Sequence, residues 1–513
     1  MVKIHIDDQR LGGVIAPELH SQFIEVLGGC IYDGIWVGEA SDIPNIDGLR
    51  LDFVEAMKAI APPVIRWPGG CYADTYHWRN GIGKRSERPV TFNENFGTFE
   101  LDTNQFGIHE FMELCRLVGA KPWLNVNLLS GSVAEMKEWM EYCNREEDTT
   151  LKKEREANGS PEAFHVEYWG IGNEPWAGGG NYTATGYADE YRKYATSAPS
   201  FKKSMMDTSA CPMHLIVCGP DGNKPEERVA WTKDLFEAFG KYRRPPMYGY
   251  DLHFYNWNIS HPGDTDIKFD REGWYRVIDG CFELEDVLNE QYALIQEGLA
   301  QLPSTEAMER LHPNRCELVV GEWGNWHGSA FMARPALFQQ VTMRDAITSA
   351  LTLDIFHRNC SKVKMACVAQ TVNVLNALFL TDGRRFIKTP NYDVFEMYMV
   401  HRGARLIEDL CSDEASECKK IHVLASLRDN MMSVNVVNTD YDCPETIELC
   451  LPENYRYVSG KVLCASAPDD FNSWEQPDLI RAAPCEAPVM AGSGQFCVNV
   501  PAASVSVYQF IKQ

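Results

Sequence analysis

The chain has 513 residues, which is more than one typical domain and enough for a large barrel with a companion domain. Its 72 acidic residues outnumber the 48 basic ones, which gives a formal net charge of −24. Such a surface repels phosphate backbones and anionic lipids, so the composition argues against nucleic-acid and membrane-surface binding.

The N-terminal residues MVKIHIDDQRLGGVI lack the basic and apolar regions that are typical of a signal peptide. No stretch reaches the roughly 20 consecutive apolar residues that are needed to span a bilayer. The 17 cysteines include no Cys-x-x-Cys pair, which favours reduced structural thiols over a metal ribbon or a disulfide framework. We therefore expect a cytoplasmic protein without a resident metal or cofactor.

Between about residue 18 and residue 380, short apolar runs alternate with longer segments of helical periodicity. This alternation is typical of βαβ units around a parallel sheet, and it assigns residues 16–403 to a (β/α)8 TIM barrel. The eight expected strands are Gln22–Glu25, Val64–Trp67, Pro122–Asn127, Val166–Asn173, Leu215–Gly219, Tyr250–Tyr255, Leu318–Trp323 and Lys364–Gln370. Helices are expected at 136–143, 225–239, 283–301 and 334–357. The long loops, notably 68–97 and 175–182, carry Gly, Asn and Pro.

After about residue 403 the pattern changes to short runs of alternating polarity between turn residues. The clearest runs are 421–428, 431–440, 446–453 and 504–510. They predict a C-terminal β-sandwich over residues 404–513. Because chain termini often lie close together, we expect the N-terminal segment 1–15 to add a strand to this sandwich.

Polar residues stand at the ends of several expected strands, and the carboxyl ends of barrel strands form the mouth of a TIM barrel. The fourth strand ends on Asn173-Glu174 and the seventh ends on Glu322. One strand-terminal glutamate is as often a capping or salt-bridging residue as a catalytic one. Two such residues suit glycoside hydrolysis, in which one carboxyl protonates the leaving oxygen and the other attacks the anomeric carbon.

The motif Trp-Gly-Ile-Gly-Asn-Glu, with Glu-Trp-Gly on a later strand, resembles a clan of retaining glycosidases. In that clan the acid/base lies on strand four and the nucleophile on strand seven. More specifically, the chain resembles glycoside hydrolase family 51, the α-L-arabinofuranosidases. The resemblance runs nearly end to end, through segments 23–39, 66–83, 102–111, 170–181, 251–255, 321–326, 369–378 and 389–403.

The resemblance implies that Glu174 is the acid/base and Glu322 the nucleophile, with Arg66 and Tyr255 as hydrogen-bond donors to Glu322. It also implies that Asn173 binds the sugar 2-hydroxyl. The full set of expected substrate-binding residues is Glu25, Arg66, Cys71, Asn125, Asn173, His253, Tyr255 and Gln370. For His253 the alternative is a satisfied core imidazole, and for Cys71 it is a buried filler.

Two positions depart from the family pattern. Gly321 precedes the expected nucleophile where the family more often has Asp, and Lys84 stands where Pro is common. The glycine run 178–180 lacks the Lys-Ser/Thr of a P-loop and the spacing of a dinucleotide fingerprint, so we reject a phosphate site. Pro175-Trp176 and this glycine run leave the choice of substrate open.

The expected function is that of an exo-acting, retaining and metal-independent α-L-arabinofuranosidase on arabinose-decorated oligosaccharides. The resemblance also implies a homo-oligomer, commonly a hexamer. One alternative is another retaining glycosidase of the same clan, acting on β-D-galactofuranosides, xylosides or internal glucan bonds. The others are a metal-dependent barrel enzyme and a catalytically inactive carbohydrate-binding barrel. The preferred linkage (1,2, 1,3 or 1,5) stays open.

Overall fold

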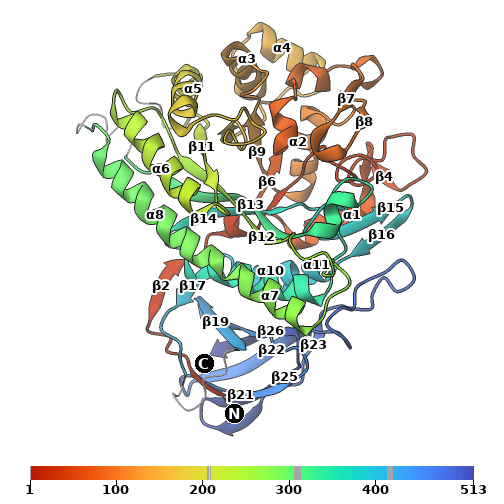
Figure 1. Cartoon of the computed structure of the whole chain (residues 1–513), viewed down its shortest axis with the longest axis vertical. Helices are drawn as coiled ribbons and strands as arrows, with labels where there is room; N and C mark the ends of the chain where they lie inside the picture. Colours follow the sequence, from red (N-terminus) through yellow and green to blue (C-terminus); the bar gives the residue numbers. More distant parts are fainter. Residues whose placement is uncertain (1, 205–206, 208, 305–313, 413–419) are drawn as a thin grey trace.

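The computed structural model describes residues 2–204, 207, 209–304, 314–412 and 420–513. A closed barrel of parallel strands occupies the upper part of Figure 1, and two sheets of mainly antiparallel strands lie below it. Around the barrel the strands follow chain order, β3-β6-β9-β10-β11-β12-β13-β14. The expected fold class, a (β/α)8 barrel with a C-terminal β-sandwich, is confirmed.

The barrel contains all eight expected strands, with most ends shifted by a few residues. They are β3 (Ser21–Phe23), β6 (Val64–Trp67), β9 (Lys121–Val126), β10 (Tyr168–Ile171), β11 (His214–Asp221), β12 (Gly249–Asn258), β13 (Glu317–His327) and β14 (Val363–Ala369). β12 and β13 pair from Gly249–Glu317 to Asn258–His327, so both extend beyond the barrel at its mouth. Residues at this mouth are thereby carried on two long, paired strands.

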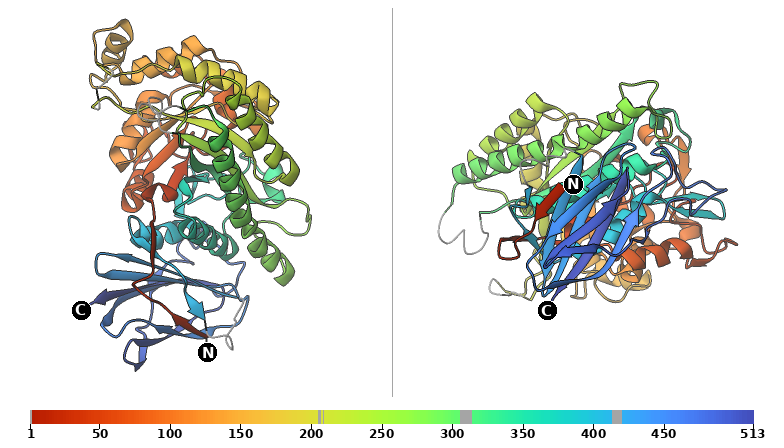
Figure 2. Two further views of the ribbon diagram at one scale, coloured as in Figure 1. Left: turned by 90° about the vertical axis from the view of Figure 1, so that its left-hand side faces the viewer. Right: turned by 90° about the horizontal axis from the view of Figure 1, so that it is seen from below.

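Helices follow each barrel strand and cover the barrel from outside (Figures 1 and 2). They are α1 (Leu51–Ile60), α2 (Ile108–Val118), α3 (Val133–Asn144), α4 (Thr150–Ala157), α5 (Ala184–Ser197), α6 (Pro225–Gly240), α7 (Arg271–Cys281), α8 (Glu283–Gln301), α10 (Met343–Arg358) and α11 (Pro390–Tyr398). Among the described residues, no helix is both long and apolar enough to cross a membrane.

The expected helix at 334–357 begins nine residues later than the sequence pattern suggests, at Met343. A capping box fixes this start, because the Asp345 carboxylate accepts the backbone N–H of Thr342 at 2.9 Å. Upstream, Leu337 has a left-handed φ of 55°, which a helix cannot contain. Residues 334–342 therefore form a loop at the barrel mouth instead of the first turns of α10.

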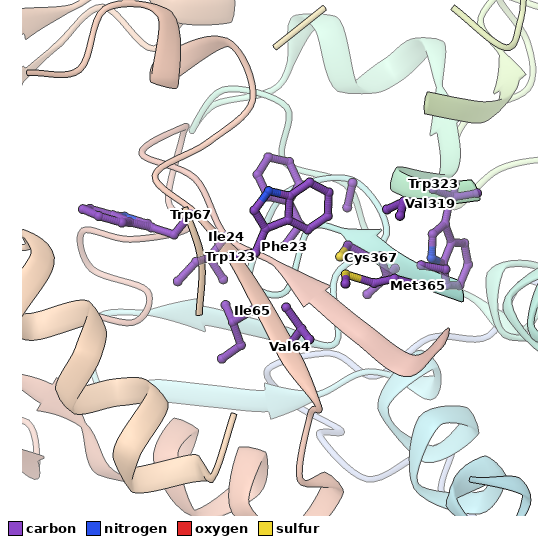
Figure 3. Packing of buried hydrophobic residues seen from close by; sticks show 14 of the residues in the cluster. Phe23, Ile24, Val64, Ile65, Trp67, Trp123, Val319, Trp323, Met365 and Cys367 are labelled. Atoms are coloured by element: carbon purple, nitrogen blue, oxygen red, sulfur yellow. The ribbon is translucent and has the colours of Figure 1, made fainter. Parts of the chain in front are cut away.

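The barrel strands are buried on both faces, as expected for a parallel sheet covered by helices. Figure 3 shows part of this core, where Phe23, Trp123, Val319 and Cys367 come from four different strands. Each of these side chains is at most 1% exposed. A core of this size gives the strand ends fixed positions from which polar side chains reach the mouth.

The C-terminal part contains a seven-stranded sheet, β2-β17-β19-β20-β26-β22-β23, and a five-stranded sheet, β18-β1-β21-β25-β24. Their bounds are β1 (Val2–His5), β2 (Leu11–Val14), β17 (Arg405–Ile407), β18 (Cys411–Ser412), β19 (Ile421–Arg428), β20 (Met431–Asn438), β21 (Glu445–Cys450), β22 (Tyr455–Leu463), β23 (Ala483–Pro484), β24 (Val489–Gly492), β25 (Gln495–Val500) and β26 (Ser504–Lys512). β1 pairs in parallel with β21, so chain segments from both ends share one sheet.

Within the described part of the chain, three two-stranded hairpins lie outside the barrel sheet. They are β4 (Asn45–Ile46) with β5 (Leu49–Arg50), β7 (Thr91–Asn93) with β8 (Glu100–Asp102), and β15 (Phe379–Asp382) with β16 (Arg385–Lys388). The β7–β8 hairpin starts inside the segment 68–97, which the sequence pattern assigned to a loop.

Three buried histidines lie where the barrel meets the sandwich. The Nε2 atoms of His20 and His357 are 2.9 Å apart, and His401 contacts Ser426 Oγ and Asn435 Oδ1 of the sandwich, both at 2.7 Å. Burial lowers the pKa of all three, in His401 to about 4. These side chains are therefore neutral in the folded protein at neutral pH.

The buried histidines predict a pH-dependent part of the stability. Between pH 6.5 and 4, His401 is protonated in the unfolded chain but stays neutral in the folded protein. Its contribution therefore destabilises the fold as the pH falls. We expect the free energy of unfolding of the unaltered chain, relative to His401→Gln, to fall by about 3 kcal/mol between pH 7 and pH 4. Urea unfolding at several pH values measures this difference.

Asp354 titrates in the opposite direction, because burial raises its pKa to about 7. Asn435 contacts both Asp354 and His401, so the same comparison in an Asp354→Asn background removes the contribution of Asp354. A difference in unfolding free energy that stays constant over this pH range would contradict the prediction.

Candidate active site

Two carboxylates and an imidazole meet at the barrel mouth. Glu174 follows β10, Glu322 lies in β13, and His253 lies in β12 between them. His253 Nδ1 is 2.8 Å from Glu174 Oε1 and 3.6 Å from Glu322 Oε1. One oxygen of each glutamate and a ring nitrogen of His253 all lie within 4.8 Å of one another. The two expected carboxylates thus face a common space.

Glu322 is surrounded by donors. Arg66 Nη1 donates to Oε1 at 2.7 Å, and the hydroxyl of Tyr255 donates to Oε2 at 2.7 Å. Burial alone would raise the pKa of Glu322, but the positive charges of His253 and Arg66 and these hydrogen bonds hold it below its usual value. Glu322 is therefore ionised at neutral pH, as a nucleophile has to be.

Glu174 has the opposite balance. Burial and the nearby negative charge of Glu322 raise the pKa of Glu174, although the hydrogen bond to His253 works against this rise. Its side chain is 16% exposed, against 8% for Glu322. Glu174 is thus the more accessible of the two carboxyls and the one that holds a proton more readily.

The backbone at Glu174 is unusual. Its φ is 38°, in the left-handed region that non-glycine residues seldom adopt, and such geometry is concentrated at functional sites. The turn is held by the Glu174 carbonyl, which accepts from the N–H groups of Ala177 and Gly179. A Cβ at Gly179 would overlap the carbonyl oxygen of Asn173. The glycine run 178–180 therefore allows a tight backbone turn behind the acid.

Glu25 lies deeper in the site and is 4% exposed. Its carboxylate accepts from the backbone N–H of Tyr72 and from Gln370 Nε2, both at 2.8 Å. Burial, helped by the negative charge of Glu322, raises the pKa of Glu25 to about 8. Cys71 precedes Tyr72 in the same loop, and its thiol pKa is raised by burial and by the charge of Glu174.

Three buried amides have one atom free for a ligand. Asn173 Oδ1 accepts from Arg66 Nη2 and Asn125 Nδ2 donates to the Gly69 carbonyl, both at 2.7 Å. Within the described ranges, Asn173 Nδ2, Asn125 Oδ1 and Gln370 Oε1 are buried without a hydrogen-bond partner. An unsatisfied buried polar atom costs about 1–3 kcal/mol. A ligand rich in hydroxyl groups would satisfy all three.

The ligand atoms of Glu174, His253 and Glu322 are close enough together to hold a metal ion. The surroundings disfavour this use. The guanidinium of Arg66 already neutralises Glu322, and both oxygens of Glu322 accept short hydrogen bonds. A cation here would have to displace these donors and tolerate the charge of Arg66.

Sequence reasoning missed two acids and an aromatic cluster. Asp251, two residues before His253 in β12, stands within an apolar run, and that is the signal that could have identified it. Asp74 is 2% exposed, and neither of its oxygens has a partner among the described residues. Burial and the charge of Glu174 raise the pKa of Asp74 well above its usual value. Asp74 therefore holds a proton more readily than an exposed carboxyl does, whereas the carboxylate of Asp251 accepts a backbone N–H and lies beside His253.

The aromatic cluster surrounds Trp326, which lies beyond Glu322 on β13. Its ring centroid is 5.0 Å from that of Tyr255, 5.3 Å from that of Phe331 and 5.9 Å from that of Phe96. Phe96 and Phe331 are 47% and 48% exposed, so a partly open aromatic surface starts beside the donor to Glu322.

The two departures from the family pattern lie in different surroundings. A Cβ at Gly321 would be 2.7 Å from Cγ of Asp251, so the carboxylate of Asp251 takes the space beside this glycine. Lys84 is exposed and donates to Glu87 Oε1 at 3.1 Å. Gly321 therefore bears on the site, whereas Lys84 belongs to the surface.

A closed (β/α)8 barrel with unequal carboxyls at its fourth and seventh strands, beside unsatisfied buried amides, defines a glycoside hydrolase. Residues 56–270 match the α-L-arabinofuranosidase 1 domain, and residues 321–504 match the α-L-arabinofuranosidase C-terminal domain.

Individual relatives agree with these matches. The intracellular exo-α-L-arabinofuranosidase of Bacteroides ovatus is 34% identical over 98% of this chain and 94% of its own. A probable α-L-arabinofuranosidase C of Aspergillus fumigatus is 31% identical over 77% of this chain and 74% of its own. The crystal structure of the family 51 arabinofuranosidase from Xanthomonas axonopodis pv. citri is 31% identical, with a TM-score of 0.88 over 99% of this chain and 100% of its own. The chain belongs to glycoside hydrolase family 51, the α-L-arabinofuranosidases.

Proposed function

We propose that the protein removes terminal α-L-arabinofuranosyl residues from the non-reducing ends of oligosaccharides, with retention of the anomeric configuration. The observation that carries the proposal is the pair of carboxyls, whose oxygens approach within 4.8 Å and whose pKa values are shifted in opposite directions. Retaining enzymes hold their two carboxyl groups about 5–5.5 Å apart, whereas inverting enzymes need about 6.5–9.5 Å to admit a water molecule.

The reaction has two steps. Glu322 attacks the anomeric carbon while Glu174 gives its proton to the glycosidic oxygen, so the bond to the leaving group breaks and an ester to Glu322 forms. Glu174 is then ionised and takes a proton from a water molecule, which attacks the same carbon and releases Glu322. Once Glu322 is esterified its negative charge is gone, so the pKa of Glu174 falls to suit its second role as a base.

The sugar would be held by the unsatisfied amides of Asn125, Asn173 and Gln370 together with Glu25 and Cys71. Asn173 is oriented by Arg66, which also holds Glu322. Asn173 Nδ2 would donate to the oxygen of the 2-hydroxyl and so orient its O–H, and the hydrogen bond that this O–H donates strengthens as positive charge develops on the sugar ring, which lowers the barrier. Arg66 thus links sugar orientation to the charge state of the nucleophile.

Exo-action is supported by the burial of the sugar-binding side chains, since Glu25, Asn125 and Gln370 are 4%, 1% and 2% exposed. Such a closed end suits a terminal residue, and the accessible Glu174 faces the leaving group. The aromatic surface around Trp326 would then contact the following sugar of an arabinose-decorated oligosaccharide. The name of the Bacteroides ovatus relative supports exo-action and an intracellular location, and the cytoplasm stays the expected compartment. The homo-oligomer, up to a hexamer, stays a prediction.

Hydrolysis of a panel of aryl glycosides tests this function. We expect turnover of the α-L-arabinofuranoside to exceed that of the β-D-galactofuranoside, β-D-xyloside and β-D-glucoside, and to persist in EDTA. Following the anomeric proton by NMR during the first minutes reports whether the configuration is retained.

Any other outcome of the panel or of the EDTA treatment would contradict one part of the proposal. Preference for a different glycoside would keep the mechanism and replace the substrate. Loss of activity in EDTA, with recovery on adding a divalent metal, would replace the mechanism by a metal-dependent one. Folded protein that is inactive on the whole panel would favour an endo-acting enzyme or a carbohydrate-binding barrel.

A further inference from the structure

We propose that Asp251 is a positioning residue, which holds the imidazole of His253 in place beside the acid/base Glu174. We also propose that residue 321 is a glycine because any side chain there would overlap the carboxylate of Asp251. The inference rests on the proposed function, because it assigns His253 and Glu174 to proton transfer. Asp251 itself does not reach the reacting atoms. It acts through the ring of His253 and through the strand that carries the nucleophile.

The carboxylate of Asp251 is 6% exposed and has a defined partner for each oxygen. Oδ1 accepts the backbone N–H of Gly321 at 2.7 Å, and Oδ2 lies 3.2 Å from Nε2 of His253. The other ring nitrogen, Nδ1, is 2.8 Å from Glu174 Oε1. Asp251 in β12 thus contacts the β13 segment just before Glu322 directly, and it reaches the acid after β10 through His253.

Gly321 is the complementary part of this arrangement. A Cβ built at Gly321 would lie 2.7 Å from Cγ and 2.6 Å from Oδ2 of Asp251, closer than a side chain can approach without displacing it. The backbone of Gly321 lies outside the left-handed region, so the glycine is not needed for its φ angle. Its role here is to leave space for a carboxylate from the adjacent strand.

The hydrogen bonds determine which nitrogen of His253 carries a proton. The carboxylate oxygen of Asp251 accepts from Nε2–H, so it keeps this proton in place and orients Nδ1 towards Glu174. The hydrogen bond between Nδ1 and Glu174 then holds one further proton, which sits on the carboxyl or on the ring. That proton is the one that Glu174 gives to the leaving oxygen and recovers from water in the second step.

Other charged groups also surround His253 and Glu174, and their charges act on the same proton as the charge of Asp251. Glu322 and Arg66 lie on the β13 and β6 sides, and Asp221 at the end of β11 faces both Glu174 and His253. The thiols of Cys218 and Cys367 lie near Asp251 with their pKa raised by burial, so both are neutral. Removing the charge of Asp251 makes the proton shared by His253 and Glu174 easier to lose.

Asp251→Asn is the sharpest single test because it keeps the shape of the side chain. Its carbonyl oxygen can still accept from Gly321, but its amide donates to Nε2 and forces the proton onto Nδ1. His253 would then donate to Glu174 and hold it in the ionised form. We expect kcat for a substrate with a poor leaving group to fall about 100-fold, as for a misplaced catalytic group. KM should change little, and the basic limb of the kcat/KM profile should move to lower pH.

The leaving group separates this role from a general loss of structure. An activated aryl arabinofuranoside needs no proton in the first step, so the loss of kcat/KM in Asp251→Asn should largely disappear with it. Asp221→Asn is the matched control, since it removes a neighbouring carboxylate that accepts from the backbone of Asn223. Asp221 acts on Glu174 and His253 through its charge, without the hydrogen bond to Nε2 that Asp251 makes, so we expect the loss of Asp221→Asn on poor leaving groups to be clearly smaller than that of Asp251→Asn.

A relocation of the carboxylate tests the role of Gly321. Asp251→Ala and Gly321→Asp should each lower kcat, the first by removing the carboxylate and the second by crowding it. The double variant Asp251→Ala/Gly321→Asp should recover at least about tenfold over Asp251→Ala, because the new carboxylate starts in the space that the old one left.

Two results would overturn the proposal. In the first, Asp251→Asn keeps its melting temperature, and its kcat/KM falls equally for activated and poor leaving groups or does not fall at all. The second is a double variant whose losses simply add. An unaltered chain that hydrolyses no arabinofuranoside would instead overturn the proposed function, and this is established before any variant is measured.

Discussion

Glu322→Ala is expected to lower kcat for an aryl α-L-arabinofuranoside by on the order of 10⁴-fold or more, because the variant has no group to form the covalent intermediate. The substitution also leaves space beside Arg66 and Tyr255, which can hold a small anion. Azide added to this variant should therefore attack the anomeric carbon from the side of the missing carboxylate. The product would be a glycosyl azide of inverted configuration, identified by NMR.

Glu322→Gln is the control for folding, since it keeps the shape of the side chain and an acceptor for Arg66. Removing the carboxylate entirely leaves a buried guanidinium without its partner, which typically costs about 3–5 kcal/mol. We expect Glu322→Gln to be as inactive as Glu322→Ala but closer to the unaltered chain in melting temperature. Appreciable hydrolysis by folded Glu322→Gln would remove Glu322 from the role of nucleophile.

Glu174→Ala is expected to have an effect that depends on the leaving group. For natural linkages, whose leaving oxygen needs a proton, kcat/KM should fall by about 10²–10⁴-fold, which is the usual contribution of a general acid. For an activated aryl arabinofuranoside the first step needs no acid, so kcat/KM should change far less. The intermediate then accumulates, because no base activates water, and kcat falls together with KM.

Azide distinguishes this variant from the previous one. In Glu174→Ala it should attack the covalent intermediate in place of water and give a glycosyl azide of retained configuration. The basic limb of the kcat/KM profile should also disappear, since the group with the raised pKa is gone. A glycosyl azide of inverted configuration from Glu174→Ala would mean that Glu174, and not Glu322, is the nucleophile. A loss of kcat/KM that is the same for all leaving groups would contradict the role of Glu174 as the acid.

The barrel was predictable from the sequence because strands that are buried on both faces consist of nearly uninterrupted apolar residues. Val64–Trp67 has the same limits in the prediction and in the structure. The start of α10 was not predictable from periodicity. Leu337 and Val341 are buried at helical spacing, yet they lie in a loop that packs over the mouth. Burial alone gives the same apolar pattern to a packed loop and to a helix.

The proximity of Glu174 and Glu322 was also predictable, since both stand at the ends of apolar runs that meet at the mouth. The contact of Asp251 with Gly321 was not predictable. Its partner Gly321 is 70 residues away in the chain, and the contact depends on how β12 and β13 are aligned. From the sequence alone, Gly321 in place of the usual Asp suggests that a carboxylate beside Glu322 has been lost. The structure places an acid from the next strand in that space.

The pairing of β1 with β21 has a consequence for how the molecule is made. β1 ends at His5, and its partner ends at Cys450. A ribosome that adds about 5–20 residues per second needs roughly 20–90 s to produce the segment between them. All barrel strands are synthesised in that interval, while β1 and β2 remain strand edges without neighbours, which are the segments most prone to wrong pairing. The sandwich is thus the last part to assemble, and β1 waits for a partner that is made only after the whole barrel.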